Sequence, residues 1–441
     1  MKRPLLAAGL TVAFIGMVAY GTHYGPQHAL KNGLERFRAA LPPGSSFEFS
    51  SARPDLLARG AHFTDVTLHV HNVLYRAHEL HLGHVTLSSN GEISFTRLDL
   101  AQPSIQSAKI DAQANSVHLR GLIIPPDHGA GLNAVELSKL VLDHGDAQDL
   151  TITPHLENAQ GPLQLTFGTL SVDGYGRGRS TSISVDAANI THSVPTVGSY
   201  SLSFEKLTAL FGDFTAFLAH SPAPHPLPPV TMAVHGVNAF SSGGRVLIDD
   251  ITFENKLENH GVLENLLHAK GLHYRKSEEN LPVHLDGKNS TLEQATYLDT
   301  NKNKIKSNIS IEIPDYASFH FYIELLKSEK EPYNTDNQSL KSMRFSLKGD
   351  RFLQTLPKLL PTGLASYLSD GRFYLALQEL AQSEPAYAPA ADYVHAPNNR
   401  TLSIDFVPSR PIPLSAVSLI SKSPLAGMMF FNQHSISTSV Q

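Results

Sequence analysis

The feature that most constrains this chain is an alternation of apolar and polar residues in many short runs after Gly44. In the segment from Asp65 to His71, the apolar residues Val66, Leu68 and Val70 share one face. Similar runs recur along the chain: Leu80 and Leu82, Leu163, Leu165 and Phe167, Ile183 and Val185, Ile309, Ile311 and Ile313, and Phe319, Phe321 and Ile323. Because successive side chains of a strand point to opposite faces, the pattern predicts a long antiparallel sheet with one apolar face.

Helical spacing of apolar residues is less common in the sequence. It predicts helices over Phe204–Leu218, over residues 259–272 with Gly271 as the stop signal, and over Phe352–Leu368. The tail returns to strand patterns at Phe373–Leu377 and Leu402–Phe406. We therefore expect a fold that is mainly β with a few helices (α+β), in which the antiparallel sheet is extended and either flat or curled.

The amino terminus has the pattern of a membrane-directing segment. Lys2 and Arg3 precede an apolar run from Pro4 to Tyr20, which as a helix is about 25 Å long against about 30 Å of bilayer core. This predicts a signal-anchor or transmembrane helix over residues 1–24. A cleaved signal peptide is the alternative, because Ala19-Tyr20-Gly21 suits a signal peptidase.

An amphipathic segment follows the apolar run. Leu30, Leu34, Phe37 and Leu41 recur at helical spacing before Pro42-Pro43-Gly44, which predicts a neck helix within residues 25–43. The basic residues at the amino terminus favour a cytoplasmic amino terminus, with the bulk of the chain across the membrane. Basic residues in the neck favour the opposite orientation: Lys31, Arg36 and Arg38.

The remaining chain divides at a proline-rich stretch. Residues 221–229 contain five prolines and cannot support a regular element, so they predict a linker. The expected organisation is a strand-rich domain over 44–220 and a second strand-rich region with helices over 230–441.

Composition excludes several classes of function. The chain has no cysteine, which removes disulfides, zinc-thiolate sites and thiol nucleophiles and is compatible with a bacterial envelope protein. Only 17% of residues are charged and the net charge is −5, so no nucleic-acid partner is expected. The sequence has no nucleophile elbow, phosphate-binding loop or H-E-x-x-H motif, so we expect neither an enzyme nor a cofactor.

Histidine is the one unusual residue type, with 23 in the chain and six between residues 62 and 84. If Asp65–His71 pairs with His78–Leu82, the candidates for a zinc or copper site are His69, His71, Glu79 and His81. The alternative is that these residues fill solvent-facing strand positions. That alternative is the default, so no metal is expected.

Four segments carry a resemblance to a known family. They are Phe47-Glu-Phe49, Asp65-Val-Thr-Leu68, Arg76-Ala-His-Glu-Leu-His-Leu82 and Arg97-Leu-Asp-Leu-Ala-Gln-Pro-Ser-Ile105. In order and pattern they resemble the beginning of AsmA-like bacterial envelope proteins, or of a related anchored periplasmic family. The resemblance implies one amino-terminal transmembrane helix and a periplasmic curled sheet whose apolar inner face shields lipid acyl chains. The Lys- and Asn-rich stretch over residues 270–341 has no counterpart in that pattern.

Two functions remain as expectations. The first is a single-pass inner-membrane protein with its bulk in the periplasm, whose apolar sheet face handles lipid or serves envelope biogenesis. Its partners would be inner-membrane lipids at the amino-terminal helix and a lipid or envelope protein at the sheet. The lipid-facing candidates are Val66, Leu68, Val70, Leu80 and Leu82. The second is a non-catalytic scaffold or partner-binding module in which the same face is an ordinary closed core.

Overall fold

The protein is mainly antiparallel β in the computed structural model. Two compact units divide the chain: a first unit, Met1–Ser242, and a second unit, Gly243–Gln441. The structure describes residues 30–31, 34–35, 38, 44–55, 60–70, 72–87, 92–124, 139–155, 161–194, 198–215, 230–241, 244–258, 262–276, 284–285, 287–299, 302–327, 338–349, 351, 372–397, 399–414 and 436–441.

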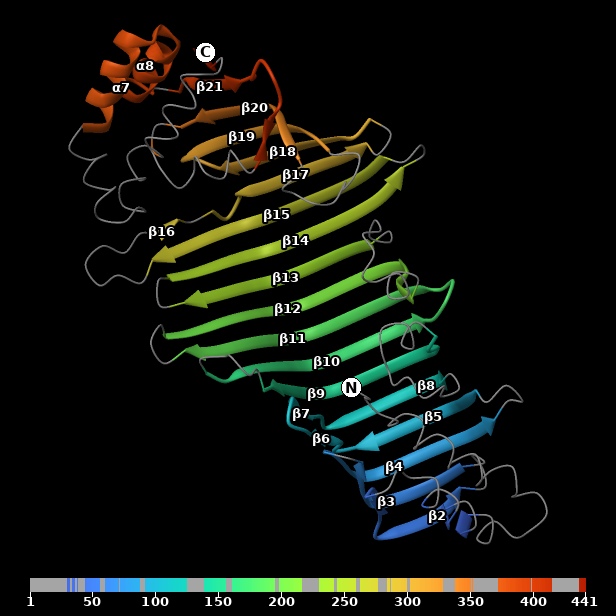
Figure 1. Ribbon diagram of the computed structural model, residues 1–441. Coiled ribbons are helices and arrows are strands. Elements are labelled where there is room, and N and C mark those ends of the chain that lie inside the picture. Colours follow the sequence, from blue (N-terminus) through green and yellow to red (C-terminus); the bar gives the residue numbers. More distant parts are fainter. Residues whose placement is uncertain are drawn as a thin grey trace. The chain divides into compact units, whose positions relative to one another are not determined.

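The first unit is an antiparallel meander in which strands that follow one another in sequence lie side by side (Figure 1). Three positions of the ladder hold two short strands in place of one long strand: β1 and β2 on β3, β5 and β6 on β4, and β7 and β8 on β9. The strands are β1 (Ser46–Glu48), β2 (Ser51–Asp55), β3 (Gly60–Val70), β4 (Val73–Leu87), β5 (Ile93–Ala101), β6 (Ser104–Gln106), β7 (Ile110–Gln113), β8 (Ser116–Ile124), β9 (Leu142–Pro154), β10 (Leu163–Tyr175), β11 (Ser180–Val194), β12 (Gly198–Asp213) and β13 (Val230–Ser241).

The second unit repeats the antiparallel plan and adds helices near the carboxyl terminus. Its strands are β14 (Gly244–Glu258), β15 (Val262–Lys276), β16 (His284–Leu285), β17 (Thr291–Asp299), β18 (Lys304–Ile313), β19 (Ala317–Leu326), β20 (Ser339–Lys348), β21 (Thr401–Phe406), β22 (Ile412–Pro413) and β23 (Ile436–Val440). Its helices are α7 (Arg372–Ser383), the 3₁₀ turn η2 (Pro385–Tyr387) and α8 (Ala388–His395).

The alternation of buried side chains shifts by one residue within several strands of the first unit. In β3, Phe63 and Val66 are both buried although they are three residues apart. Between them Asp65 has a φ of 50°, in the left-handed region, and is skipped in the pairing of β3 with β4. His78 drops out of β4 at the same level, and its Nδ1 lies 2.9 Å from the Asp65 carboxylate. Matched irregularities therefore keep the apolar residues of neighbouring strands on one face.

The strand predictions are confirmed for residues 309–313, 319–323 and 402–406, which lie in β18, β19 and β21. Two helix predictions are wrong, because residues 204–213 lie in β12 and residues 262–272 lie in β15. The strand predicted over residues 373–377 is also wrong, since this segment belongs to α7, whose sequence is rich in strong helix formers. The helix predicted over 352–368 lies outside the described residues.

The division between the units does not fall at the predicted linker. Strand β13 pairs with β12, for example Val234 with Leu207, and so extends the first meander beyond residue 229. A proline-rich connection can join two antiparallel neighbours as well as two domains, and the sequence of residues 221–229 does not distinguish these cases. The linker itself lies outside the described residues.

Little of the amino-terminal prediction falls on described residues, since the expected transmembrane helix over 1–24 lies outside them. In the expected neck, Leu30, Lys31, Leu34, Glu35 and Arg38 are helical. In the part of the chain that the structure describes, no helix has the length and apolar character needed to cross a membrane.

Candidate apolar binding site

An apolar cavity of about 430 Å³ lies on one face of the first unit. This volume falls within the range of about 300–1,000 Å³ that is usual for small-molecule sites. Its lining residues come from several strands and are almost all apolar: Phe47, Val66, Leu68, Tyr75, Arg76, Ala77, Leu80, Leu82, Phe95, Leu98, Leu100, Pro103, Ile105, Ala112, Gln113, Ala114, Val117, Ile124 and Leu150. The cavity therefore suits a ligand with an extended hydrocarbon part.

Four of the five predicted lipid-facing residues line this cavity: Val66, Leu68, Leu80 and Leu82. The fifth, Val70, is 2% exposed and packs in the adjoining hydrophobic cluster without lining the cavity. The site also contains residues that were not predicted as lipid-facing, among them Tyr75 and Leu150. Alternation alone could have placed Leu150 on an apolar face, but only the register of β9 brings it to the cavity.

The register of the strands extends the apolar face beyond the cavity. Residues that pair across successive strands form two apolar rows that cross the first unit from β3 to β13. The first row is Phe63, Leu80, Leu100, Val117, Ala147, Leu170, Val185, Leu207 and Val234. The second row is Ala61, Leu82, Leu98, Leu119, Gly145, Val172, Ile183, Ala209 and Met232.

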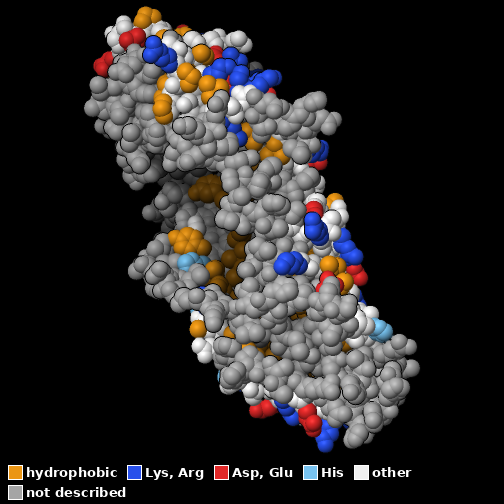
Figure 2. Space-filling view, turned by 45° about the vertical axis from the view of Figure 1, so that its right-hand side comes forward, with side chains coloured by type: hydrophobic (Ala, Val, Ile, Leu, Met, Phe, Trp, Pro, Cys, Tyr) orange, Lys and Arg blue, Asp and Glu red, His pale blue; other side chains and the backbone are white. Residues whose placement is uncertain are grey.

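Figure 2 shows hydrophobic side chains inside a hollow of the visible surface, whereas the charged side chains in view lie mainly at the edges of that surface. The same separation follows from the pairing in the first unit, where a polar row lies between the two apolar rows and points to the opposite face. This row is His62, His81, Asp99, His118, Asp146, Ser171, Ser184 and Thr208. One face of the sheet is thus suited to apolar ligands and the other to water.

Helical residues before β1 contact one end of the apolar face. Leu30 and Leu34 are each 8% exposed and pack in the same cluster as Phe47 and Phe63. Arg38 donates a hydrogen bond from Nε to the Phe47 carbonyl oxygen at 3.3 Å. The amphipathic pattern in the sequence therefore corresponds to packing on the sheet at these two leucines.

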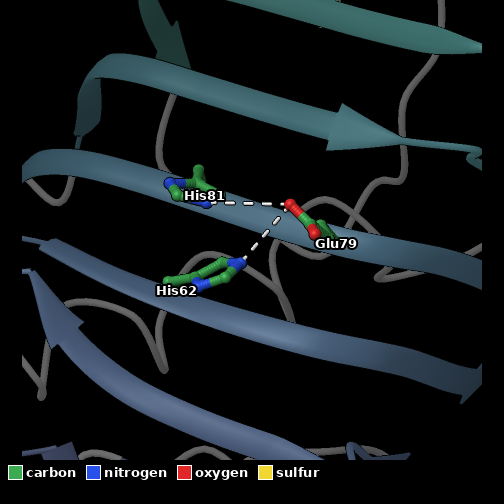
Figure 3. Close-up of side chains that lie close together, drawn as sticks. All are labelled: His62, Glu79 and His81. Atoms are coloured by element: carbon green, nitrogen blue, oxygen red, sulfur yellow. Dashed lines mark ion pairs between the residues drawn. The ribbon is translucent and has the colours of Figure 1, made fainter.

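Imidazole and carboxylate groups cluster on the polar face, but not in the predicted register. The position opposite His81, predicted for His69, is occupied by His62 (Figure 3), and His69 pairs with Leu74 instead. The turn between β3 and β4 is tighter than the sequence suggested, because Val70 already pairs with Val73. The pairing predicted for His69 is therefore wrong, and His71 lies outside the described residues.

Asp99 is the most enclosed carboxylate of the polar row, with its side chain 9% exposed. It accepts hydrogen bonds from Arg97 and Arg120, and His118 Nδ1 lies 3.1 Å away. Burial acts to raise the pKa of Asp99, but the hydrogen bonds from Arg120, Arg97 and His118 outweigh it, so the pKa lies below its ordinary value. This depressed pKa makes Asp99 stabilising in its charged form.

We expect Asp99→Asn to lower the stability of the protein at neutral pH by about 1–2 kcal/mol, since charge-assisted hydrogen bonds are lost from arginines that are partly exposed. A carboxylate with a lower pKa in the folded state stabilises above its unfolded pKa and loses this effect as the pH falls through the folded pKa. Urea unfolding at neutral pH and in acid should therefore show a difference between variant and wild type that shrinks as the pH falls through the folded-state pKa of Asp99.

The exposed residue Glu48 of β1 provides the control for this experiment. Glu48→Gln should leave the urea midpoint nearly unchanged at both pH values. An equal loss of stability in Asp99→Asn at neutral and acidic pH would contradict the role assigned to the Asp99 charge.

The second unit has its own apolar row, formed by Ile251, Ala269, Leu292, Ile311, Phe319, Leu347, Leu402 and Val440. Tyr393 of α8 is fully buried against part of this row, in a cluster with Leu347 and Leu402. The carboxyl-terminal end of this face is therefore covered by the chain's own helix.

Comparison with known proteins assigns no family or function to the chain. No protein-family model matches the chain, and the search of curated proteins gives no significant match. The function must therefore be inferred from the sheet and its cavity.

Proposed function

We propose that the protein is a membrane-anchored lipid-handling protein of the bacterial envelope, and that its apolar sheet face binds acyl chains. The observation that supports this most directly is the cavity at Val66, Leu68, Leu80 and Leu82, whose lining is almost wholly apolar. The paired apolar rows extend beyond the cavity, as a chain-like ligand requires. In this proposal the sheet curls around its apolar face, as in AsmA-like proteins.

The location is proposed from the amino-terminal sequence. The apolar run from Pro4 to Tyr20, after Lys2 and Arg3, anchors the chain in the inner membrane as a single-pass protein with its bulk in the periplasm. Anchoring would keep the cavity close to a bilayer, where lipid is the most abundant ligand with a long apolar part.

A second candidate function is a scaffold that binds envelope proteins. It is favoured by the covering of apolar surface by the chain's own helical residues, namely Leu30 and Leu34 in the first unit and Tyr393 in the second. A sheet closed in this way over its whole length would be a core rather than a binding surface.

Lipid analysis of the purified full-length chain separates the two functions. We expect mass spectrometry of the solvent-extracted protein to identify about one or more bound lipids per chain that survive detergent exchange. Val117→Phe places a larger side chain in the cavity lining, where it would crowd a bound acyl chain. Overpacking costs about 1–3 kcal/mol, so the amount of bound lipid should fall at least about fivefold.

The matched control is Thr67→Phe, which adds a similar side chain to β3 at a position next to Leu68 and on the opposite face. This variant should retain lipid as the wild type does. A wild-type protein that is free of lipid after gentle extraction, or equal retention in Val117→Phe, would contradict the lipid-binding proposal and favour the scaffold.

A further inference from the structure

We propose that His62, Glu79 and His81 form a binding site for one divalent cation of the zinc class on the polar face of the first unit. His62 comes from β3, whereas Glu79 and His81 come from β4. The three side chains point toward one another (Figure 3), and one potential ligand atom from each lies within 4.8 Å of the other two. Two imidazoles and one carboxylate, with water completing the shell, are a donor set that zinc commonly takes.

The distances between the donor atoms are close to those of a coordinated cation. Glu79 Oε2 lies 3.6 Å from His62 Nε2 and 4.0 Å from His81 Nε2. Ligands bound to a tetrahedral zinc at about 2.0–2.1 Å lie about 3.3 Å apart. Small side-chain rotations would therefore bring all three atoms to coordinating distance without moving the strands.

The backbone fixes the relative positions of these residues. His62 and His81 are direct cross-strand partners, and their rings lie with centroids 3.8 Å apart. Glu79 precedes His81 by two residues and so shares its face of β4. A site made on two paired strands needs little ordering when the cation binds, which favours affinity.

One ring nitrogen of the cluster makes an ion pair with Glu79 but no hydrogen bond to the described residues. His62 Nε2, which faces Glu79, is shielded from solvent and makes no hydrogen bond to any described residue. Shielded ring nitrogens are usually satisfied by a hydrogen bond, a water or a metal ion. A cation between His62 and Glu79 would satisfy this nitrogen.

The surrounding charges allow a cation at this position. Arg97, beside His81 on the neighbouring strand, is neutralised by Asp99 through their ion pair. Arg53, the cross-strand partner of His62 on β2, is exposed, so its guanidinium can extend into water. Asp99, the cross-strand partner of His81, lies beside the three ligands and is held by Arg97, Arg120 and His118.

The proposed site lies behind the apolar cavity. Leu80 and Leu82, which line the cavity, alternate along β4 with the two proposed ligands Glu79 and His81. A bound cation would join β3 to β4 at the level of these leucines and would stabilise this part of the sheet, because it binds the folded chain. The site does not depend on whether the cavity binds lipid.

Isothermal titration calorimetry of the full-length protein, stripped with a chelator and titrated with zinc chloride, tests the proposal. We expect one zinc per chain. His62→Ala removes a ligand and Glu79→Gln replaces a charged carboxylate ligand with a neutral amide, so each should weaken binding by about tenfold or more. Glu79→Gln keeps the shape of the side chain and so tests the carboxylate with little change to packing. Cobalt(II) should give the visible absorption of a tetrahedral site in the wild type but not in His62→Ala or Glu79→Gln.

The matched control is His69→Ala, which removes an exposed histidine on the same face of β3. It should bind zinc with wild-type affinity and stoichiometry, and zinc should raise the thermal midpoint of this control as much as that of the wild type. The absence of stoichiometric zinc binding by the wild type would overturn the proposal. So would a single zinc site whose affinity is unchanged in both His62→Ala and Glu79→Gln.

Discussion

Phe63→Ala is expected to destabilise the β3–β4 region of the first unit by about 3–5 kcal/mol, the usual cost of truncating a fully buried phenylalanine. Phe63 has no exposed surface, and its ring makes edge-on contacts with Phe47 at 6.1 Å and with Phe49 at 5.5 Å between centroids. Truncation would leave a cavity in the cluster that supports one end of the apolar face.

Native-state hydrogen exchange is the suitable measurement, because a chain of two units need not unfold in one step. A loss of 3 kcal/mol should speed exchange of the protected amides of β3 and β4 by about a hundredfold or more. Leu210→Ala in β12 is the control, since Leu210 is 53% exposed and its truncation should change exchange little. Similar exchange in the two variants would contradict a central role for Phe63.

Tyr393→Ala should have a comparable effect in the second unit, again about 3–5 kcal/mol. Tyr393 is fully buried and joins α8 to the sheet through a cluster that includes Leu347 and Leu402. Because α8 is short, its stability comes mainly from this packing rather than from helix propensity. We expect truncation to release α8 and to expose apolar side chains of β20 and β21.

Limited proteolysis and hydrogen exchange would detect this change as faster cleavage within residues 388–395 and faster exchange in α8. Leu375→Ala provides the control, because Leu375 lies on α7 and is 57% exposed. If the Tyr393 variant retained the protection of α8, the helix would be held by other contacts and its role as a cover for the sheet would be wrong.

These two clusters also bear on the proposed function. A lipid-binding sheet needs apolar surface that the chain itself leaves accessible, whereas Phe63 and Tyr393 mark places where the apolar face is closed by the chain's own packing. At the cavity lined by Leu68 and Leu80, by contrast, the apolar face is not filled by the chain's own side chains, which leaves room for a ligand. The lipid analysis of Val117→Phe therefore concerns the part of the face on which the proposal depends.

The strand-rich class and several residues of the apolar face follow from the amino-acid sequence alone. Period-two alternation at Val66, Leu68, Leu80 and Leu82 identified residues that line the cavity, because strand geometry forces alternate side chains to one side. This inference needs only local information, and it holds wherever a strand runs without interruption.

Tertiary structure decided where strands shift and which residues pair. In β12, Phe204 and Leu207 share a face although they are three residues apart, because Glu205 drops out of the ladder opposite Gly236, whose φ is 64°. That spacing imitates a helix, which explains the wrong prediction there. In β15, Gly271 does adopt the left-handed conformation expected of a helix stop, but within a strand.

On the polar face, too, the cross-strand neighbours could not be predicted from the sequence. The sequence placed six histidines close together, but the turn after Val70 decided that His62, rather than His69, lies opposite His81. Register depends on the length of a turn and on matched irregularities such as those at Asp65 and His78, and a shift of one position changes every cross-strand neighbour. The composition of the candidate site was thus present in the sequence, while its geometry arises only from the pairing of the strands.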